Sequence, residues 1–255
     1  MANIVPVKKE QHQNLKIANK RNLAHAAGQH IVPVNAREFA QASTSFPVVL
    51  VQDPDSKRFR SVIMLGLEGG ENLFYSDDKW HGLYVPQSIG MAPFGLGLDP
   101  EKEKTLTTCV DLDSPFVGED KDQALFDAEG NDTEFFKNVQ DSLGQLYDNE
   151  VASEKFVQEV VDKDLLQELE LTIAFASGEK KKLTGIFTLN EKKLQELSDE
   201  QVLDFHKRGM FVPIYAMLGS IGQVNRLIQL HNDHSEQKIS GIQIQTVNAE
   251  EGAAA

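Results

Sequence analysis

Two apolar, β-branched runs stand at residues 46–52 and 59–67, on either side of an Asp-Pro turn. This arrangement is typical of a β-hairpin. Residues 73–75 and the alternating stretch 105–113 are predicted to be further strands. The first half of the chain is therefore expected to be a meander of antiparallel strands.

The second half of the chain has a different period. After Thr133, a residue suited to capping a helix, apolar residues recur at helical spacing as far as Val161. Residues 169–175 and 182–189 return to a period of two, which predicts one further hairpin. Antiparallel strands mainly in the N-terminal half, followed by helices with this hairpin in the C-terminal half, indicate an α+β fold.

Capping signals and apolar stretches mark three more helices. Asn35 has a glutamate three residues later, which predicts a short helix over residues 36–42. Ser198 has a glutamine three residues later, which predicts another helix that begins there. The strongly apolar stretch 213–230 is expected to form one buried amphipathic helix.

Polarity along the chain predicts three parts. Residues 1–29 are polar and mildly basic, and we expect them to form an arm. Residues 30–230 carry the periodic patterns and are expected to form a single α+β domain. Residues 231–255 are expected to be a flexible polar tail, with a short strand at residues 239–245.

The chain of 255 residues carries a formal net charge of −14. Nucleic acids and anionic membranes attract clustered Lys and Arg, so neither is an expected partner. The densely acidic stretch 99–170 indicates a solvated face, with a docking surface for a basic partner as the alternative. No apolar run is long enough for a transmembrane segment, and no secretory signal is recognisable, so a soluble cytoplasmic protein is expected.

Few residues are arranged for chemistry. Cys109, the only cysteine, has no basic neighbour in the sequence and is expected to be a buried thiol. His231 and His234 lack further metal ligands nearby, so no metal site is predicted. Residues 219–222 lack the spacing of a nucleophile elbow and indicate close helix packing instead. The catalytic residues, if any, stay unknown, and no cofactor is expected.

The richest group of candidate site residues lies on the loops after the first strands. Asn72, Trp80, His81 and Tyr84 combine aromatic rings with polar groups, as ligand pockets do. We interpret these four residues as a candidate ligand-binding site. The alternative is that the aromatic residues only pack the loops onto the sheet.

The same region resembles the SapC family of bacterial proteins. The resemblance continues into the second half of the chain and covers roughly residues 30–230, in the same order. The segments that carry it are residues 47–50, 65–67, 72–74, Trp80, 84–86 and 93–94, and later residues 183–187, 190–194, Leu197, Gly209, 214–216, Gly219, Ser220 and Leu227.

The resemblance implies a role more than a mechanism, because the family has no established catalytic residues. Its name is linked to bacterial surface layers, and its members occur beside genes for outer-membrane uptake receptors and flavin-dependent halogenase-like proteins. Our leading hypothesis is a non-enzymatic accessory or interaction protein of nutrient uptake or cell-surface systems, with a protein partner or a homo-oligomer. The alternatives are a small-molecule-binding protein or enzyme with its pocket near Trp80 and Tyr84, and a surface-layer component.

Overall fold

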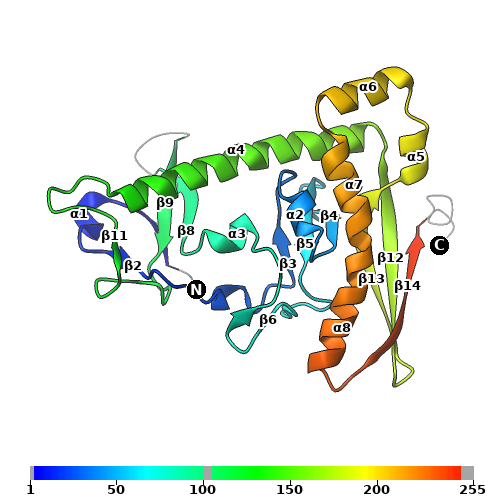
Figure 1. The fold of residues 1–255 in the computed structure, drawn as a ribbon, viewed down its shortest axis with the longest axis horizontal. Coiled ribbons are helices and arrows are strands. Elements are labelled where there is room, and N and C mark those ends of the chain that lie inside the picture. The colour runs from blue at the N-terminus through cyan, green and yellow to red at the C-terminus, as the bar shows by residue number, and fades with distance from the viewer. Residues whose placement is uncertain (1–2, 100–104, 248–255) are drawn as a thin grey trace. The chain divides into compact units, whose positions relative to one another are not determined.

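The computed structural model describes residues 3–99 and 105–247. It has antiparallel sheets and helices, so the predicted α+β class is confirmed (Figure 1). The residue contacts divide the chain into two compact units, and each unit is built from two separate stretches of the sequence. Unit 1 takes residues 1–24 and 87–148, and unit 2 takes residues 25–86 and 149–255.

Unit 1 contains two small antiparallel sheets. Their strand orders are β1-β9-β8 and β10-β2-β11. The predicted strand at residues 105–113 is confirmed as β9. The elements of unit 1 are β1 Ile4–Pro6, α1 Lys9–His12, β2 Lys16–Ile17, α3 Gln87–Gly90, β8 Phe94–Leu98, β9 Leu106–Asp111, β10 Val117–Gly118, β11 Gln123–Ala124 and the first part of α4 Glu134–Asp162.

An aromatic core holds unit 1 together. Phe136 of α4 meets Phe126 edge to face at 5.6 Å between ring centroids and lies 6.3 Å from Phe94 of β8. Ile17 of β2 and Val110 of β9 are buried in the same cluster. Each sheet therefore contributes apolar side chains to one core under the first half of α4.

Unit 2 is built on a six-stranded antiparallel sheet in the order β14-β12-β13-β4-β5-β3. The predicted hairpin at residues 169–175 and 182–189 is confirmed as β12 and β13, and the Asp-Pro hairpin as β4 and β5. The strands of unit 2 are β3 Ile31–Pro33, β4 Val48–Gln52, β5 Phe59–Met64, β12 Leu166–Phe175, β13 Lys180–Leu189 and β14 Ile239–Thr246, with the separate pair β6 Tyr75–Ser76 and β7 Lys79–Trp80.

Helices cover the sheet of unit 2, where α7 contacts both β4 and β13 (Figure 1). The hydroxyl of Ser220, at the end of α7, accepts a hydrogen bond of 2.8 Å from the Val48 backbone N–H of β4. Ser220 has no exposed surface, so this bond joins the helix to the middle of the sheet. The helices of unit 2 are α2 Phe39–Ala42, α5 Glu191–Gln195, α6 Asp199–Lys207, α7 Phe211–Ser220, α8 Val224–His234 and the second part of α4. Two 3-10 turns accompany them: η1 Ala24–Ala26, where the chain passes from unit 1 into unit 2, and η2 Ile221–Gln223, between α7 and α8.

Two of the predicted helix starts are confirmed. The Thr133 hydroxyl accepts a bond of 3.2 Å from the Phe136 N–H at the beginning of α4. Ser198 and Gln201 form the expected capping box at the start of α6. Within the described residues, no helix combines the length and the apolar character that crossing a membrane requires.

Two helices differ from the prediction. The stretch 213–230 is divided into α7 and α8 by the 3-10 turn η2, because Gly219 and Gly222 lower helical propensity at that point. The expected helix over residues 36–42 is shortened to α2, and residues 36–38 form a turn that leads into it. The expected cap residues do bond each other: the Asn35 side chain accepts from the Arg37 N–H, and the Glu38 carboxylate accepts from the Asn35 N–H.

The segments expected to be an arm and a tail also contain strands. Ile4–Pro6 pairs with β9, and Ile17 is buried in the core of unit 1. The short strand expected at residues 239–245 is found as β14, which pairs with β12. The rest of the predicted tail, residues 248–255, lies outside the described residues, and the predicted division into arm, domain and tail stays a prediction.

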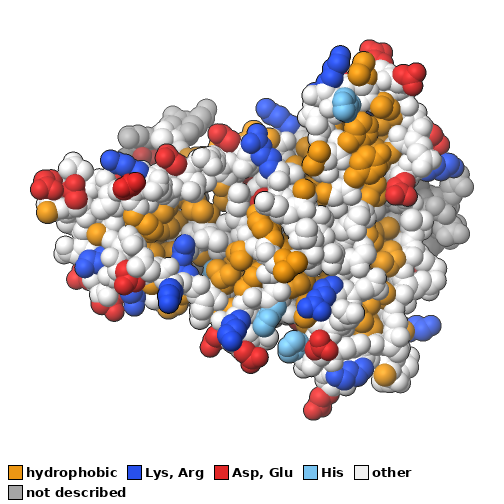
Figure 2. All heavy atoms as spheres, in the orientation of Figure 1, with side chains coloured by type: hydrophobic (Ala, Val, Ile, Leu, Met, Phe, Trp, Pro, Cys, Tyr) orange, Lys and Arg blue, Asp and Glu red, His pale blue; other side chains and the backbone are white. Residues whose placement is uncertain are grey.

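The outer face of α7 is apolar and exposed. Figure 2 shows hydrophobic side chains gathered over α7 and the neighbouring α6. Among them Val212 and Tyr215 are exposed by 64% and 61%, and the Tyr215 ring stacks on Phe211 at 5.8 Å. The opposite face of α7 is buried, with Ile214 and Met217 fully covered, so α7 is amphipathic as its sequence predicts.

Candidate functional site

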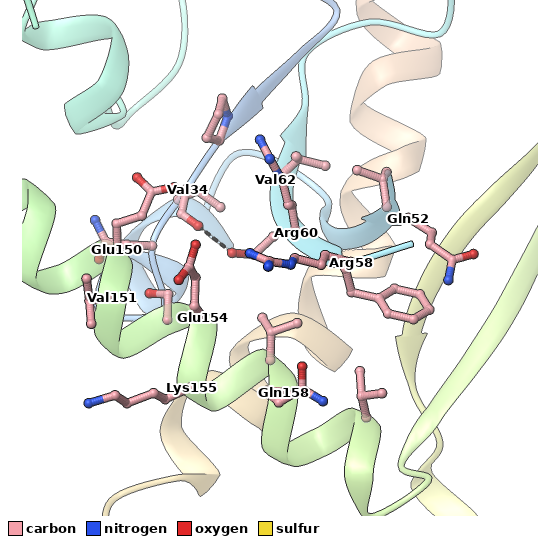
Figure 3. Close-up of a pocket in the computed structure, with 18 of the residues that line it drawn as sticks. Val34, Gln52, Arg58, Arg60, Val62, Glu150, Val151, Glu154, Lys155 and Gln158 are labelled. Atoms are coloured by element: carbon pink, nitrogen blue, oxygen red, sulfur yellow. Dashed lines mark hydrogen bonds between the residues drawn. The ribbon is translucent and has the colours of Figure 1, made fainter. Parts of the chain in front are cut away.

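A cleft of about 920 Å³ lies in unit 2, between one end of the six-stranded sheet and helix α4 (Figure 3). One wall is formed by residues 57–62, which lead into β5 and run along it. The other wall is formed by one face of α4 between residues 150 and 161, which does not include Ala152, and residues 31–35 complete the cleft. The volume lies within the range of about 300–1,000 Å³ that is common for ligand sites.

A rigid turn positions the strand wall. The Asp53 carboxylate accepts bonds from the Ser56 N–H at 2.7 Å, the Ser56 hydroxyl at 2.9 Å and the Asp55 N–H at 3.1 Å. The bonds from Ser56 keep the pKa of Asp53 below its usual value. Lys57 then adopts a left-handed backbone with φ of 58°, and the chain reverses so that Arg58 leads into β5.

The edge of β5 is open inside the cleft. The short strand β3 pairs only with residues 62–64 of β5, and the Val34 N–H then donates to the Ser61 carbonyl at 3.2 Å. Backbone groups of alternate residues in a strand face the same neighbour, so Phe59 must face the same side as Ser61. Within the described part of the chain, no strand pairs with Phe59 on that side.

The inner part of the cleft is apolar and tied together by backbone bonds. Val34, Val62 and Val157 each expose 5% of their surface or less. The Ser153 hydroxyl of α4 accepts a bond of 2.6 Å from the Ala36 N–H, just beyond β3. Helix α4 is thereby fixed to the segment that follows the edge strand, and the two walls are held in position.

Charges of both signs line the opening of the cleft. Arg58 and Arg60 lie on the strand wall, and Glu150 and Glu154 lie on the helix wall (Figure 3). All four residues are exposed. None of them makes an ion pair within 4.0 Å with another residue that the structure describes. Arg60 does lie near enough to Asp53 to help lower its pKa, but the four charged groups remain open to an ion pair with a bound molecule.

Two of the four predicted site residues make local contacts. Asn72 is buried, donates to the Ala26 carbonyl at 2.7 Å and accepts from the Phe74 N–H at 2.9 Å. His81 is exposed, and its Nε2 lies 3.0 Å from the Ser76 hydroxyl. These bonds shape the loops on which the residues lie.

The other two predicted site residues, Trp80 and Tyr84, are half-buried neighbours. The Trp80 indole N–H donates to the Tyr84 carbonyl at 2.9 Å, and its ring lies 6.0 Å from that of Phe46. The Tyr84 hydroxyl donates to the buried Glu38 carboxylate at 2.5 Å. Burial raises the pKa of Tyr84, and the bond to Glu38 raises it further. The structure thus brings Trp80 and Tyr84 together, while a ligand-binding role for Asn72, Trp80, His81 and Tyr84 stays a prediction.

The remaining reactive side chains have structural surroundings. Burial raises the pKa of the Cys109 thiol, which is the environment expected of an inert cysteine. The His231 Nδ1 lies 3.2 Å from the Glu71 carboxylate, and the His234 Nδ1 lies 2.9 Å from a backbone carbonyl. Within residues 3–99 and 105–247, no three His, Cys, Asp or Glu side chains are grouped as a metal site would require.

Sequence reasoning did not find the cleft. Two signals were present: the basic residues Arg58 and Arg60 directly after a turn, and Glu150, Glu154 and Gln158 spaced four residues apart on one helix face. Each signal alone is typical of a solvated surface. Only the fold shows that the two segments, about ninety residues apart in the sequence, line the same cleft.

Comparison with known proteins agrees with the resemblance seen in the sequence. The model of one protein family, described as SapC, matches residues 7–227. No curated protein matches the chain, and no solved structure matches it. Since the family model covers most of the 255 residues, the chain belongs to the SapC family.

Proposed function

We propose that this protein acts by binding, as an accessory or interaction protein, and that the cleft between β5 and α4 is its binding site. The observation that supports this proposal most strongly is the set of unpaired charges around an apolar interior. Arg58 and Arg60 lie across the cleft from Glu150 and Glu154, and none of the four forms an ion pair with a residue that the structure describes. A ligand gains specificity from such groups because they need not first break bonds within the protein.

The cellular setting that we propose follows from membership of the SapC family. The resemblance associates the family with cell-surface systems and with outer-membrane uptake receptors. A protein that captures a partner or ligand in a cleft fits an accessory role beside such systems. A catalytic role is not part of the proposal, because no set of nucleophile, base and oriented partner emerges among the residues described above.

Blocking the cleft tests the proposal. Glu154 is exposed, lines the cleft and has no ion-pair partner among residues 3–99 and 105–247, so Glu154→Trp should fill the cleft without disturbing the core. Ala152 is exposed on the same helix but does not line the cleft, so Ala152→Trp is the matched control. Circular dichroism and a thermal melt establish that both variants are folded.

Native mass spectrometry of the full chain, isolated gently from its host, then provides the measurement. We expect a bound species on the wild type and on Ala152→Trp, and its loss from Glu154→Trp. A species that persists on Glu154→Trp, or the absence of any bound species from all three proteins, would contradict the proposal.

A further inference from the structure

We infer that the occupant of the cleft is an extended segment of a partner polypeptide, whose backbone pairs with the open edge of β5 at Phe59. The inference rests on the proposed function of the cleft as the binding site. It goes further by naming the chemical class of the ligand, the backbone groups that hold it and the pattern of side chains that it should carry.

The first argument is the unfilled position next to β3. The N–H and C=O of Phe59 face the side on which β3 would continue, but the chain leaves the sheet after Val34. The turn at Asn35, fixed by the bond from the Arg37 N–H, directs the following residues toward α2. A polypeptide strand offers the alternating donors and acceptors that match this edge.

The second argument is the position of α4. The cleft places residues 150–161 of the helix across from the open edge, so the vacant strand position forms a groove with a helix as its outer wall. Peptide-binding domains use such grooves, in which main-chain bonds provide affinity and the flanking surfaces read alternate side chains. The Ser153 bond to the Ala36 N–H holds this wall in place without closing the groove.

The third argument is charge. Arg58 directly precedes β5 and its carbonyl still accepts a bond from the Asp53 N–H beside it, while Arg60 lies on β5. The two arginines are exposed and two residues apart in this extended stretch, so their side chains lie on the same face of the sheet. Cross-strand neighbours on one face lie about 5 Å apart, and opposite charges there stabilise the pair. An added strand should therefore carry acidic residues two positions apart, one beside Arg58 and one beside Arg60.

A displayed library of random ten-residue peptides is the probe. It is selected on the full-length wild-type chain after depletion on Glu154→Trp, so that only peptides dependent on the cleft are retained. We expect enrichment of sequences with two acidic residues separated by one position. Arg60→Glu should weaken the selected peptides by about tenfold or more, whereas Arg226→Glu, an exposed charge reversal on α8 outside the cleft, should leave their affinity unchanged.

N-methylation of a selected peptide, one position at a time, tests strand addition itself. Methylation should weaken binding by about tenfold at one position only, that of the residue whose N–H donates to the Phe59 carbonyl, because the neighbouring Ser61 carbonyl is already bonded to Val34. Peptides that depend on the cleft but tolerate methylation at every position would overturn strand addition and leave the binding function intact. If the library yields no peptide that depends on the cleft, the polypeptide ligand is refuted, even where native mass spectrometry still shows a species lost from Glu154→Trp.

Discussion

Replacing Tyr84 with phenylalanine removes one hydroxyl group from a buried network. That hydroxyl donates to Glu38 at 2.5 Å, and Glu38 exposes only 3% of its surface. Tyr75 provides a matched control, because its hydroxyl donates to the exposed Asp78 carboxylate at 3.3 Å. The two substitutions delete the same atom from a buried and from a solvated hydrogen bond.

The expected magnitude follows from the environment of the carboxylate. A hydrogen bond to a charged group contributes about 1.5–3 kcal/mol, and a buried acceptor that loses its donor keeps most of the desolvation cost. One Glu38 oxygen still accepts from the Asn35 amide and backbone N–H, so only part of the network is lost. We therefore expect Tyr84→Phe to lower the free energy of unfolding by about 2 kcal/mol, and Tyr75→Phe to lower it by less than about 0.5 kcal/mol.

Urea unfolding followed by tryptophan fluorescence is the appropriate assay. Trp80 is the only tryptophan of the chain, and its indole is bonded to the Tyr84 carbonyl, so it reports on unit 2. Equal losses of stability for Tyr84→Phe and Tyr75→Phe would refute the reasoning.

The pH dependence provides a second check. The pKa of folded Tyr84 is raised, so its contribution is fully present below the unfolded pKa of about 10 and is lost as the pH rises toward the folded pKa. The difference between wild type and Tyr84→Phe should therefore shrink above about pH 10. A difference that stays constant into that range would contradict this assignment.

Three further predictions concern other contacts. Arg208→Gln removes the bidentate hydrogen bonds to Glu159 and should lower the free energy of unfolding by about 1 kcal/mol near pH 7. Because Arg208 lowers the pKa of Glu159, this loss of stability, measured by urea unfolding, should fade as the pH falls below about 4. A loss of stability that is unchanged at pH 3 would contradict the prediction. Ser220→Ala removes the bond to the Val48 N–H and should lower the free energy of unfolding by about 1–2 kcal/mol, so an unchanged urea midpoint would count against it. Burial raises the pKa of Cys109, so a thiol reagent should modify the native chain at least about tenfold more slowly than the urea-unfolded chain.

Local patterns predicted the local elements well. The alternation in residues 169–175 and 182–189 predicted β12 and β13, and the Ser198 capping box predicted the start of α6. These signals are reliable because they depend on neighbours in the sequence. The division of the stretch 213–230 was missed because glycines at 219 and 222 act on backbone entropy, which the apolar pattern does not record.

The cleft was not predictable for a different reason. Arg60 and Glu154 lie on opposite walls of the cleft, yet no sequence pattern near either residue indicates that the other lies close to it. The two residues line one cleft because β3 ends at Pro33 and α4 lies beside that end. Trp80 and Tyr84 were placed in one candidate ligand site, and that role stays a prediction. The structure bonds the Trp80 indole to the Tyr84 carbonyl, a contact between residues only four positions apart in the sequence.

The interleaved course of the chain has a consequence for its synthesis. Unit 1 needs residues 1–24 and 87–148, so its N-terminal strands cannot complete their sheets until the second of these stretches has been synthesised. The partner of β4 arrives later still, because Val51 pairs with Ile186 of β13. Throughout that interval β4 has an unpaired edge, which is the state most exposed to wrong pairing. The nascent chain is therefore expected to need protection of the β4 edge until β13 has been made.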